Sequence, residues 1–339
     1  MKVFLILAFL SFNSALIAQI HSPIVIAHRG ASGYLPEHTL EGKAMAHAMD
    51  ADFIEQDLVL SKDDIPVVLH DIYIDTVSDV ATRFPDRKRA DGRYYAIDFM
   101  LVELKQLKMT ERFNVDTGKQ VYENRFEKGL GNFQIATLEE EIQLIQGLNR
   151  SRQQATGIYP EIKQPAWHRK QGHDVSRIVL PILKRYGYAT KQDACWLQCF
   201  EYEEVERIRN ELKWEGKLVM LLAPFRKDKQ ANDEPDLSTH DGLKQVAKIV
   251  DGIGPSIAHV ISGKTPIERR ITDLVETAHA LKMVVHPYTM RIDELPTNVA
   301  SGDELMEVLF VQAKVDGLFS DFPDVTADWL AKQRRERNK

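Results

Sequence analysis

The sequence predicts an α/β fold built as a single eight-stranded (β/α)₈ or TIM barrel. Short apolar runs alternate with longer amphipathic stretches along the 339 residues, which is typical of parallel strands covered by helices. Nine such runs occur, but two of them must pair as a hairpin, which leaves the eight strands of a barrel. With 44% hydrophobic residues the composition is that of a globular protein, and the net charge of −6 argues against a generally basic nucleic-acid-binding protein.

Residues 1–18 predict a secretory signal peptide. Lys2 is followed by an uncharged stretch with the apolar core VFLILAFL, and cleavage is expected near Ala18 after a run that contains Ser11, Asn13, Ser14 and Ala15. The alternative is an uncleaved membrane anchor, although the apolar core is short for a span of ~20 residues.

Export would place the two cysteines in an oxidising compartment. Cys195 and Cys199 lie in the strand-like run CWLQCF. Residues four apart on a strand are separated by ~13 Å, beyond the reach of a disulfide. Two buried thiols are therefore expected.

The expected elements follow one another in a regular order. The strands cover residues 24–28, 53–60, 66–71, 157–163, 195–200, 217–224, 249–256, 283–289 and 316–323. The helices cover residues 38–49, 137–148, 175–185, 202–212, 242–249, 266–281 and 303–313. Only SKDDI separates the second strand from the third, which is far too short for a parallel crossover, so these two form an antiparallel hairpin. Chemistry is expected at the carboxyl ends of the barrel strands.

The hairpin brings titratable side chains together. If residues 58–60 pair with 67–69, His70 returns beside Asp57, whose strand face is shared by Glu55. His28 ends the neighbouring first strand. Two imidazoles near one spot suit general acid and general base catalysis, because their unperturbed pKa lies near 6.5.

A third carboxylate joins this group from the motif PEIK, in which Glu161 and Lys163 share a strand face. Together with Glu55 and Asp57 it would create strong repulsion unless a cation lay between the three groups. Oxygen ligands favour Ca²⁺ or Mg²⁺ over zinc. The alternative is a salt-bridge network with Arg29 and Lys163. With a cation, these two basic residues complete a phosphate pocket, and the sequence predicts phosphodiester cleavage.

The motifs closely resemble those of the glycerophosphodiester phosphodiesterases, specifically the periplasmic bacterial type. The stretches that carry the resemblance run in order from residue 24 to 324: IAHRGASGYLPEHTLEGKAMAHA, FIEQDLVLSKDDIPVVLHD, RFPDRKRADGRYYAIDF, GIYPEIK, LQCF, DGIGP, VVHPYT and GLFSDFPD. Where the wider family reads PENT this chain reads PEHT, and His38 is expected to begin a helix.

The resemblance implies a TIM barrel of the phosphatidylinositol-phosphodiesterase-like type in the periplasm that hydrolyses glycerophosphodiesters to sn-glycerol 3-phosphate and an alcohol. One divalent ion is implied, usually Ca²⁺, with Mg²⁺ as the alternative. The implied roles are acid/base catalysis by His28 and His70, metal ligation by Glu55, Asp57 and Glu161, and phosphate binding by Arg29 and Lys163. Gln198, near the end of its strand, is expected either to bond a substrate hydroxyl or to serve only in packing.

Two rival classes stay open from the residues alone: a phospholipase on the same scaffold, and a non-enzymatic exported binding protein. The mature chain shows no basic amphipathic helix suited to holding a bilayer, so no stable membrane insertion is expected. The presence of the whole set of site residues disfavours a binding protein. The headgroup and the attacking group, water or the glycerol hydroxyl, also stay open.

The domain organisation follows from the length. Residues 23–330 are expected to form one catalytic barrel domain, in which 72–136 is an inserted subdomain after the hairpin. These 65 residues show no clear alternation of strands and helices. Their Tyr- and Arg-rich stretch offers either a homodimer contact or a pocket wall, and the pattern favours neither.

Overall fold

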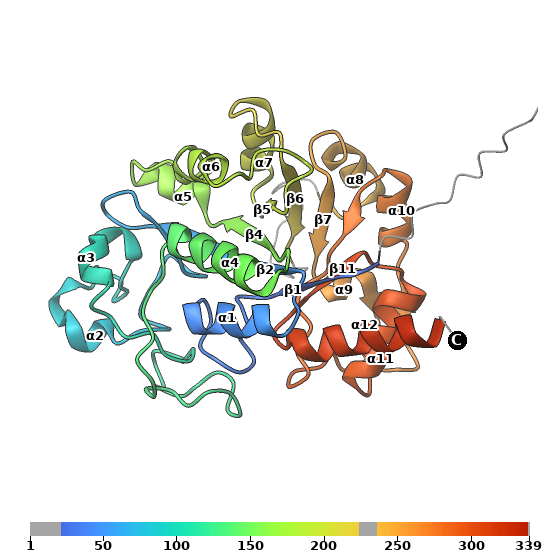
Figure 1. The fold of residues 1–339 in the computed structure, drawn as a ribbon, viewed down its shortest axis with the longest axis horizontal. Helices are drawn as coiled ribbons and strands as arrows, with labels where there is room; N and C mark the ends of the chain where they lie inside the picture. The colour runs from blue at the N-terminus through green and yellow to red at the C-terminus, as the bar shows by residue number, and fades with distance from the viewer. Residues whose placement is uncertain (1–21, 224–235, 338–339) are drawn as a thin grey trace, which may run out of the picture.

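Eight parallel strands form the barrel in the computed structural model, which describes residues 22–223 and 236–337 (Figure 1). Their hydrogen-bonded order is β10–β7–β6–β5–β4–β2–β1–β11. The two ends of this order are joined just beyond β10, where Phe319 donates its amide to the carbonyl of Pro287. The barrel strands are β1 (Ile24–Ala27), β2 (Phe53–Leu60), β4 (Gly157–Ile162), β5 (Trp196–Cys199), β6 (Lys217–Leu222), β7 (Gly252–Pro255), β10 (Val284–Val285) and β11 (Gly317–Ser320).

The predicted hairpin is confirmed. β3 (Pro66–Val68) pairs antiparallel with residues 58–60 of β2, one residue earlier than expected. The amide of Leu69 still donates to the carbonyl of Asp57, at 2.9 Å. The returning chain therefore places His70 next to Asp57, and each of the nine predicted runs contains a strand.

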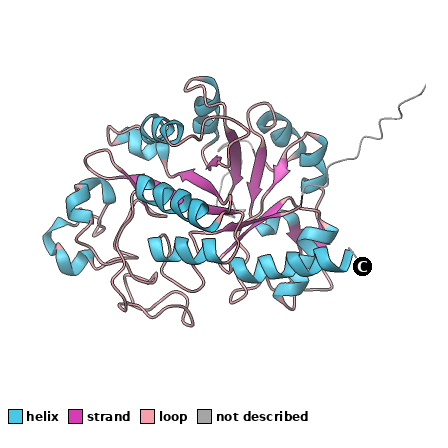
Figure 2. Cartoon of the chain, in the orientation of Figure 1, coloured by secondary structure: helices cyan, strands magenta, loops and turns pink. Residues whose placement is uncertain are grey.

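Helices cover the outside of the barrel (Figure 2). Those that follow predicted stretches are α1 (Leu40–Ala48), α4 (Leu138–Arg152), α6 (Val175–Arg185), α7 (Tyr202–Asn210), α8 (His240–Val246), α10 (Leu274–Ala280) and α11 (Gly302–Met306), which continues as the π-helix η3 (Glu307–Gln312). Short helices α5 (Pro165–Lys170) and α9 (Ile257–Val260) and the C-terminal α12 (Pro323–Arg337) were not predicted.

The helix predicted over 266–281 is wrong in its first half. There β9 (Arg270–Ile271) pairs antiparallel with β8 (Ile261–Ser262). Gly263 adopts a positive φ of 98°, which lets the chain turn back between them. The helix begins only at α10.

The apolar side chains form two layers around the sheet. The large outer layer lies between the strands and their helices, and it includes the free thiols of Cys195 and Cys199, which are buried as predicted. Inside the barrel is a smaller cluster made of Ile26, Tyr159, Val219 and Phe319. This cluster fills the barrel below the carboxyl ends of the strands.

The 72–136 segment connects β3 to α4 and lies to one side of the barrel in Figure 1, coloured cyan to green. It contains α2 (Val80–Arg83), η1 (Pro85–Arg87), η2 (Ala96–Asp98) and α3 (Leu101–Leu104). Its apolar side chains form a cluster of their own, which includes Ile74, Val80, Phe99, Leu104 and Ile135 and also takes in Val59, Val67 and Leu69 of the hairpin.

The predicted signal peptide, residues 1–18, lies outside the described residues. Among the residues that the structure describes, the longest apolar helical stretch falls short of a bilayer span.

Candidate active site

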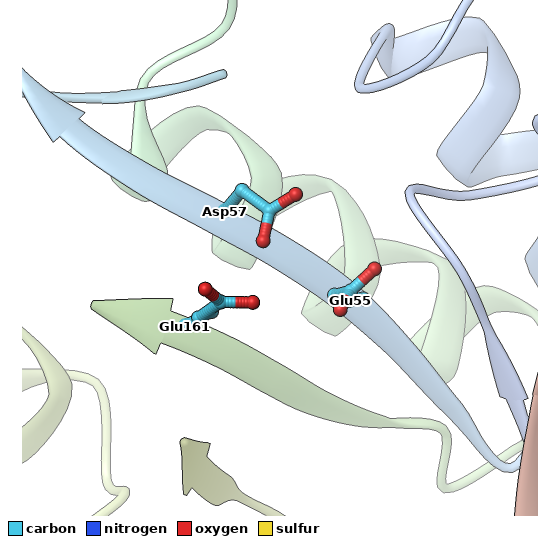
Figure 3. Close-up of side chains that lie close together, drawn as sticks. All are labelled: Glu55, Asp57 and Glu161. Atoms are coloured by element: carbon cyan, nitrogen blue, oxygen red, sulfur yellow. The ribbon is translucent and has the colours of Figure 1, made fainter. Parts of the chain in front are cut away.

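Three carboxylates converge near the carboxyl ends of β2 and β4. Glu55 and Asp57 project from the same face of β2, and Glu161, which lies beside Asp57 in the register, projects from β4 (Figure 3). One oxygen from each residue lies within 4.8 Å of the others, and all three side chains are buried. The two-residue period of a strand places these groups above the interior cluster, on the inner face of the barrel.

The electrostatics of this acidic triad suit a cation. Burial, together with Asp57 and Glu161, raises the pKa of Glu55 well above its usual range. Burial and Asp57 also raise the pKa of Glu161 to about 8, in spite of the Lys163 ammonium. Asp57 Oδ1 is buried without a hydrogen-bond partner among the described residues. An oxygen donor left bare beside two other carboxylates fits a hard divalent ion.

Asp57 is bonded on its far side by His38, for which the sequence predicts only a helix start. That expectation is wrong, because α1 begins at Leu40 with Thr39 as its N-cap, and His38 lies before it at a φ of 59°. His38 is fully buried, and its Nε2 lies 2.7 Å from Asp57 Oδ2. The one signal of this role in the sequence was the motif PEHT, in which His38 stands where the wider family has an asparagine.

Lys43 in turn fixes the ring of His38. Its buried Nζ lies 3.1 Å from His38 Nδ1, and it also donates to the backbone carbonyl of Glu55 and pairs with Glu141 at 3.2 Å. Because an ammonium only donates, His38 Nδ1 accepts and the ring proton is on Nε2, where it is donated to Asp57. Burial lowers the pKa of His38 to about 3, with a further contribution from Lys43.

His28, directly after β1, is paired with Asp321 at the exit of β11. The two atoms His28 Nδ1 and Asp321 Oδ1 are 2.5 Å apart. A carboxylate at Nδ1 holds the proton there and leaves Nε2 as the acceptor, and this Nε2 lies 3.8 Å from Glu55 Oε2. Burial lowers the pKa of His28 to about 4, although Asp321 opposes this shift.

His70, which follows β3 and lies next to Asp57, has the same arrangement. Its Nδ1 lies 2.8 Å from Asp71 Oδ1, so its Nε2 is also left as the acceptor. Burial, Arg29 and Lys163 lower the pKa of His70 to about 4. Two neutral imidazoles, each oriented by a carboxylate, thus flank the acidic triad.

Arg29 is presented by a tight turn after β1. Arg29 and Gly30 both have a positive φ, 57° and 92°, and a side chain at Gly30 would meet the backbone of Gly42 at 3.0 Å. The turn aims the Arg29 amide at Glu55 Oε2, 2.9 Å away. The Arg29 guanidinium donates to Glu37 and leaves its buried Nε unpartnered among the described residues, 3.8 Å from Asp57.

The other two predicted binding residues also contact the triad. Lys163 Nζ lies 2.7 Å from Glu161 Oε1. Gln198 is buried beside Glu161 in the register and donates its amide to Glu55 Oε1 at 2.9 Å, while its own oxygen has no partner among the described residues. By contrast His286, the third histidine at a strand end, is bonded to Tyr159 in the barrel interior.

A cavity of about 440 Å³ opens above these groups. Its polar end holds both histidines, Arg29, Gln198 and the acidic triad, and its other walls are mostly apolar. The apolar wall is formed by Phe200, Leu221, Ile257, Tyr288, Leu295, Pro296 and Phe319. The volume suits a small polar ligand with a short organic group.

The chain matches the Glycerophosphoryl diester phosphodiesterase family over residues 28–325. It is 42% identical to a glycerophosphodiester phosphodiesterase of Haemophilus influenzae, a match that covers 91% of this chain and 89% of the relative. It is 34% identical to a glycerophosphodiester phosphodiesterase of Treponema pallidum, with 92% and 93% covered.

Solved structures share the fold. An Oleispira antarctica phosphodiesterase in complex with the product sn-glycerol-3-phosphate superposes with a TM-score of 0.60 at 20% identity, covering 91% of this chain and 97% of that one. A glycerophosphodiester phosphodiesterase from Thermotoga maritima gives a TM-score of 0.55 at 19% identity, covering 91% and 98%.

Proposed function

Because the chain belongs to the glycerophosphoryl diester phosphodiesterase family and is a phosphodiesterase of this kind, we propose that His28 and His70 perform its chemistry at the acidic triad. The observation that carries the proposal is the pair of carboxylate-oriented imidazoles that flank Glu55, Asp57 and Glu161 in one cavity. The substrates are glycerophosphodiesters, and the products are sn-glycerol 3-phosphate and an alcohol.

The acidic triad would hold one divalent ion, for which we propose Ca²⁺, with Mg²⁺ as the alternative. Such an ion supplies charge stabilisation at the non-bridging oxygens of a phosphate. The bare Asp57 Oδ1 and the raised pKa values of Glu55 and Glu161 support this assignment.

The side chains around the triad bind and orient the diester. The Arg29 and Lys163 cations would attract the phosphate, Arg29 from the cavity itself and Lys163 from an adjoining pocket that shares His70 and Glu161. The unpartnered oxygen of Gln198 would accept a hydrogen bond from a glycerol hydroxyl. One imidazole takes the proton from the attacking oxygen as the new P–O bond forms. The other imidazole must first be protonated on Nε2, a state that the bound phosphodiester anion and its own aspartate favour, and it gives that proton to the departing alcohol as the old P–O bond breaks.

The test is hydrolysis of glycerophosphocholine, followed by the release of glycerol 3-phosphate with Ca²⁺ or with excess chelator. His28→Ala and His70→Ala should each lower kcat by ~10²–10⁴-fold. The matched control is His47→Ala, which removes a buried histidine that is bonded to Asn149 outside the cavity. Either catalytic variant keeping more than about a tenth of kcat contradicts the acid/base assignment, and full activity in chelator contradicts the metal assignment.

Phosphorus NMR distinguishes the two attacking groups. A transient cyclic glycerophosphate identifies the glycerol hydroxyl, whereas direct appearance of glycerol 3-phosphate identifies water.

We also propose that the chain is exported to the periplasm after removal of residues 1–18, and that 72–136 is a subdomain inserted into one catalytic barrel domain, 23–330. The apolar N-terminal stretch supports export, and the separate hydrophobic cluster supports the subdomain. Intact mass of protein from the periplasmic fraction should show the shortened chain. Recovery of only full-length chain would contradict the removal of residues 1–18, and absence of the chain from the periplasmic fraction would contradict export.

A further inference from the structure

The carboxylate behind each histidine is bound by an arginine that does not belong to the barrel. Arg112 donates from Nη1 to Asp71 Oδ2 at 2.7 Å, and Arg125 donates from Nη2 to Asp321 Oδ2 at 2.7 Å. Both arginines lie in the 72–136 segment. The two connections are separate, since one leads to His70 and the other to His28.

Arg112 also fixes a second part of the site. Its Nε and Nη2 bind the two oxygens of Glu37 at 2.9 and 2.6 Å. Glu37 in turn accepts a hydrogen bond from Arg29 at 3.0 Å. A two-point contact between a guanidinium and a carboxylate fixes orientation as well as distance. Arg112 therefore joins the support of His70 to the support of Arg29.

Arg125 is the more deeply buried of the two. Its side chain is 4% exposed, lies over the ring of Tyr122 at 3.6 Å and makes two further hydrogen bonds to Asp293. A buried guanidinium with this many partners has little freedom to move. Asp321 keeps one more partner, Arg291, whose Nε lies 2.9 Å from Oδ2.

An aspartate that uses only one oxygen can rotate about its side chain and let the bonded imidazole turn with it. A donor on the second oxygen fixes the plane of the carboxylate and, through it, the direction of the ring. At His70 this donor is Arg112, and at His28 it is Arg125 together with Arg291.

We propose that the 72–136 segment completes the active site by supplying a positioning residue for each histidine, Arg112 for His70 and Arg125 for His28. The proposal rests on the acid/base roles proposed above. The segment is thus part of the catalytic apparatus, although none of its residues lines the cavity of about 440 Å³.

Another arginine of the same segment provides a matched control. Arg93 binds both oxygens of Asp75 at 2.7 Å, within the segment and away from the cavity. Arg93→Gln removes a two-point ion pair of the same kind and should leave kcat within about twofold of wild type. Arg112→Gln and Arg125→Gln should each lower kcat by roughly 10–100-fold, with the smaller loss at Arg125 because Arg291 remains.

The decisive experiment combines each arginine variant with each histidine variant. In the His70→Ala background, Arg112→Gln should have no further effect on kcat, whereas Arg125→Gln should lower kcat by the same factor as it does in the wild-type protein. In the His28→Ala background, Arg125→Gln should have no further effect on kcat, whereas Arg112→Gln should still lower it. Any remaining effect of Arg112→Gln should fall on KM, because Glu37 also holds Arg29.

Three outcomes separate the possibilities. If each arginine variant lowers kcat by the same factor in both histidine backgrounds, the positioning roles are overturned. The same conclusion follows if Arg112→Gln and Arg125→Gln lower kcat no more than Arg93→Gln does. Full activity of His28→Ala and His70→Ala overturns the proposed function instead. If a glutamine variant does not fold, as judged by circular dichroism, the lysine variant keeps the charge but loses the two-point geometry, and the same crossed comparison applies to it.

Discussion

At the scale of single residues, the direction of one carboxylate depends on a chain of buried donors. Lys43 forces His38 to carry its proton on Nε2, and that proton is donated to Asp57 Oδ2. The other oxygen of Asp57 is thereby left bare among the described residues. His38 accordingly acts behind the proposed metal ligand, as partners of ligating groups commonly do.

His38→Leu should weaken Ca²⁺ binding by about 10–100-fold, because Asp57 would lose the donor that fixes its orientation. Isothermal titration calorimetry on chelator-treated protein measures this affinity directly. His47→Leu is the control, since it removes another buried histidine, on α1, whose partner is Asn149. Equal affinities for the two variants would show that His38 does not orient Asp57.

The buried carboxyl group of Glu111 lowers the stability of the folded protein by an amount that depends on pH. Its side chain is buried in the 72–136 segment, and burial together with Glu37 raises its pKa to about 8. Between pH ~4.5 and 8 the unfolded chain has released this proton while the folded chain keeps it. The unfolded state then binds fewer protons, so this group lowers the stability as the pH rises through that window.

Glu111→Gln should remove this cost. The variant and the wild type should have similar melting temperatures near pH 4, and the variant should become the more stable protein as the pH approaches 8. Differential scanning calorimetry across this range measures the difference. A constant difference at every pH would mean that Glu111 ionises at its ordinary pKa in the folded protein.

At the scale of elements, a buried ion pair joins α1 to α4 beneath the site. Lys43 on α1 and Glu141 on α4 are both fully shielded from solvent, and Lys43 also supports the carbonyl of Glu55 on β2. Helices are otherwise held to a sheet by apolar contacts, which allow small shifts. This pair fixes the position of α1 against the strand that carries the acidic triad.

Lys43→Met should destabilise the protein by about 3–5 kcal/mol, because it leaves the buried Glu141 carboxyl without its cation. Urea unfolding followed by tryptophan fluorescence measures the loss. The double variant Lys43→Met, Glu141→Leu should recover part of it, since no buried charge remains. A double variant as unstable as the single one would place the loss in packing around Lys43 rather than in the unpaired carboxyl.

The elements that the sequence could predict are those with a local signal. Strands alternate or run apolar, and the short SKDDI connection allows only a hairpin, so the barrel and the convergence of Glu55, Asp57 and Glu161 follow from the residues. The prediction of a helix over 266–281 was wrong in its first half, because the pattern of apolar residues there fits a short hairpin as well as a helical turn. His38 was missed because its function depends on Lys43 and Asp57, contacts that no local pattern reveals.

At the scale of the whole molecule, the largest gap in prediction is the 72–136 segment. Its length marked it as extra to a barrel of roughly 250 residues, but its role could not be inferred from pattern. Arg112 and Arg125 reach partners as distant in the chain as Glu37 and Asp321. Such contacts depend on the folded arrangement of the segment against the barrel, so they become visible only in three dimensions.

The acidic triad also links the stability of the whole barrel to the proposed metal. Ionising three adjacent buried carboxyl groups is costly in the metal-free fold, because their mutual repulsion and burial raise the pKa of Glu55 and Glu161. An ion that binds only the folded state stabilises it by about 2.7 kcal/mol at a free concentration 100 times its Kd. For a barrel of this size the melting temperature should rise by about 4 °C. The triple variant Glu55→Gln, Asp57→Asn, Glu161→Gln should melt above chelated wild type, because the repulsion is gone, and should not respond to Ca²⁺. Differential scanning fluorimetry with Ca²⁺ or chelator compares the two proteins, and an equal Ca²⁺ shift in both would place the stabilising ion elsewhere on the molecule.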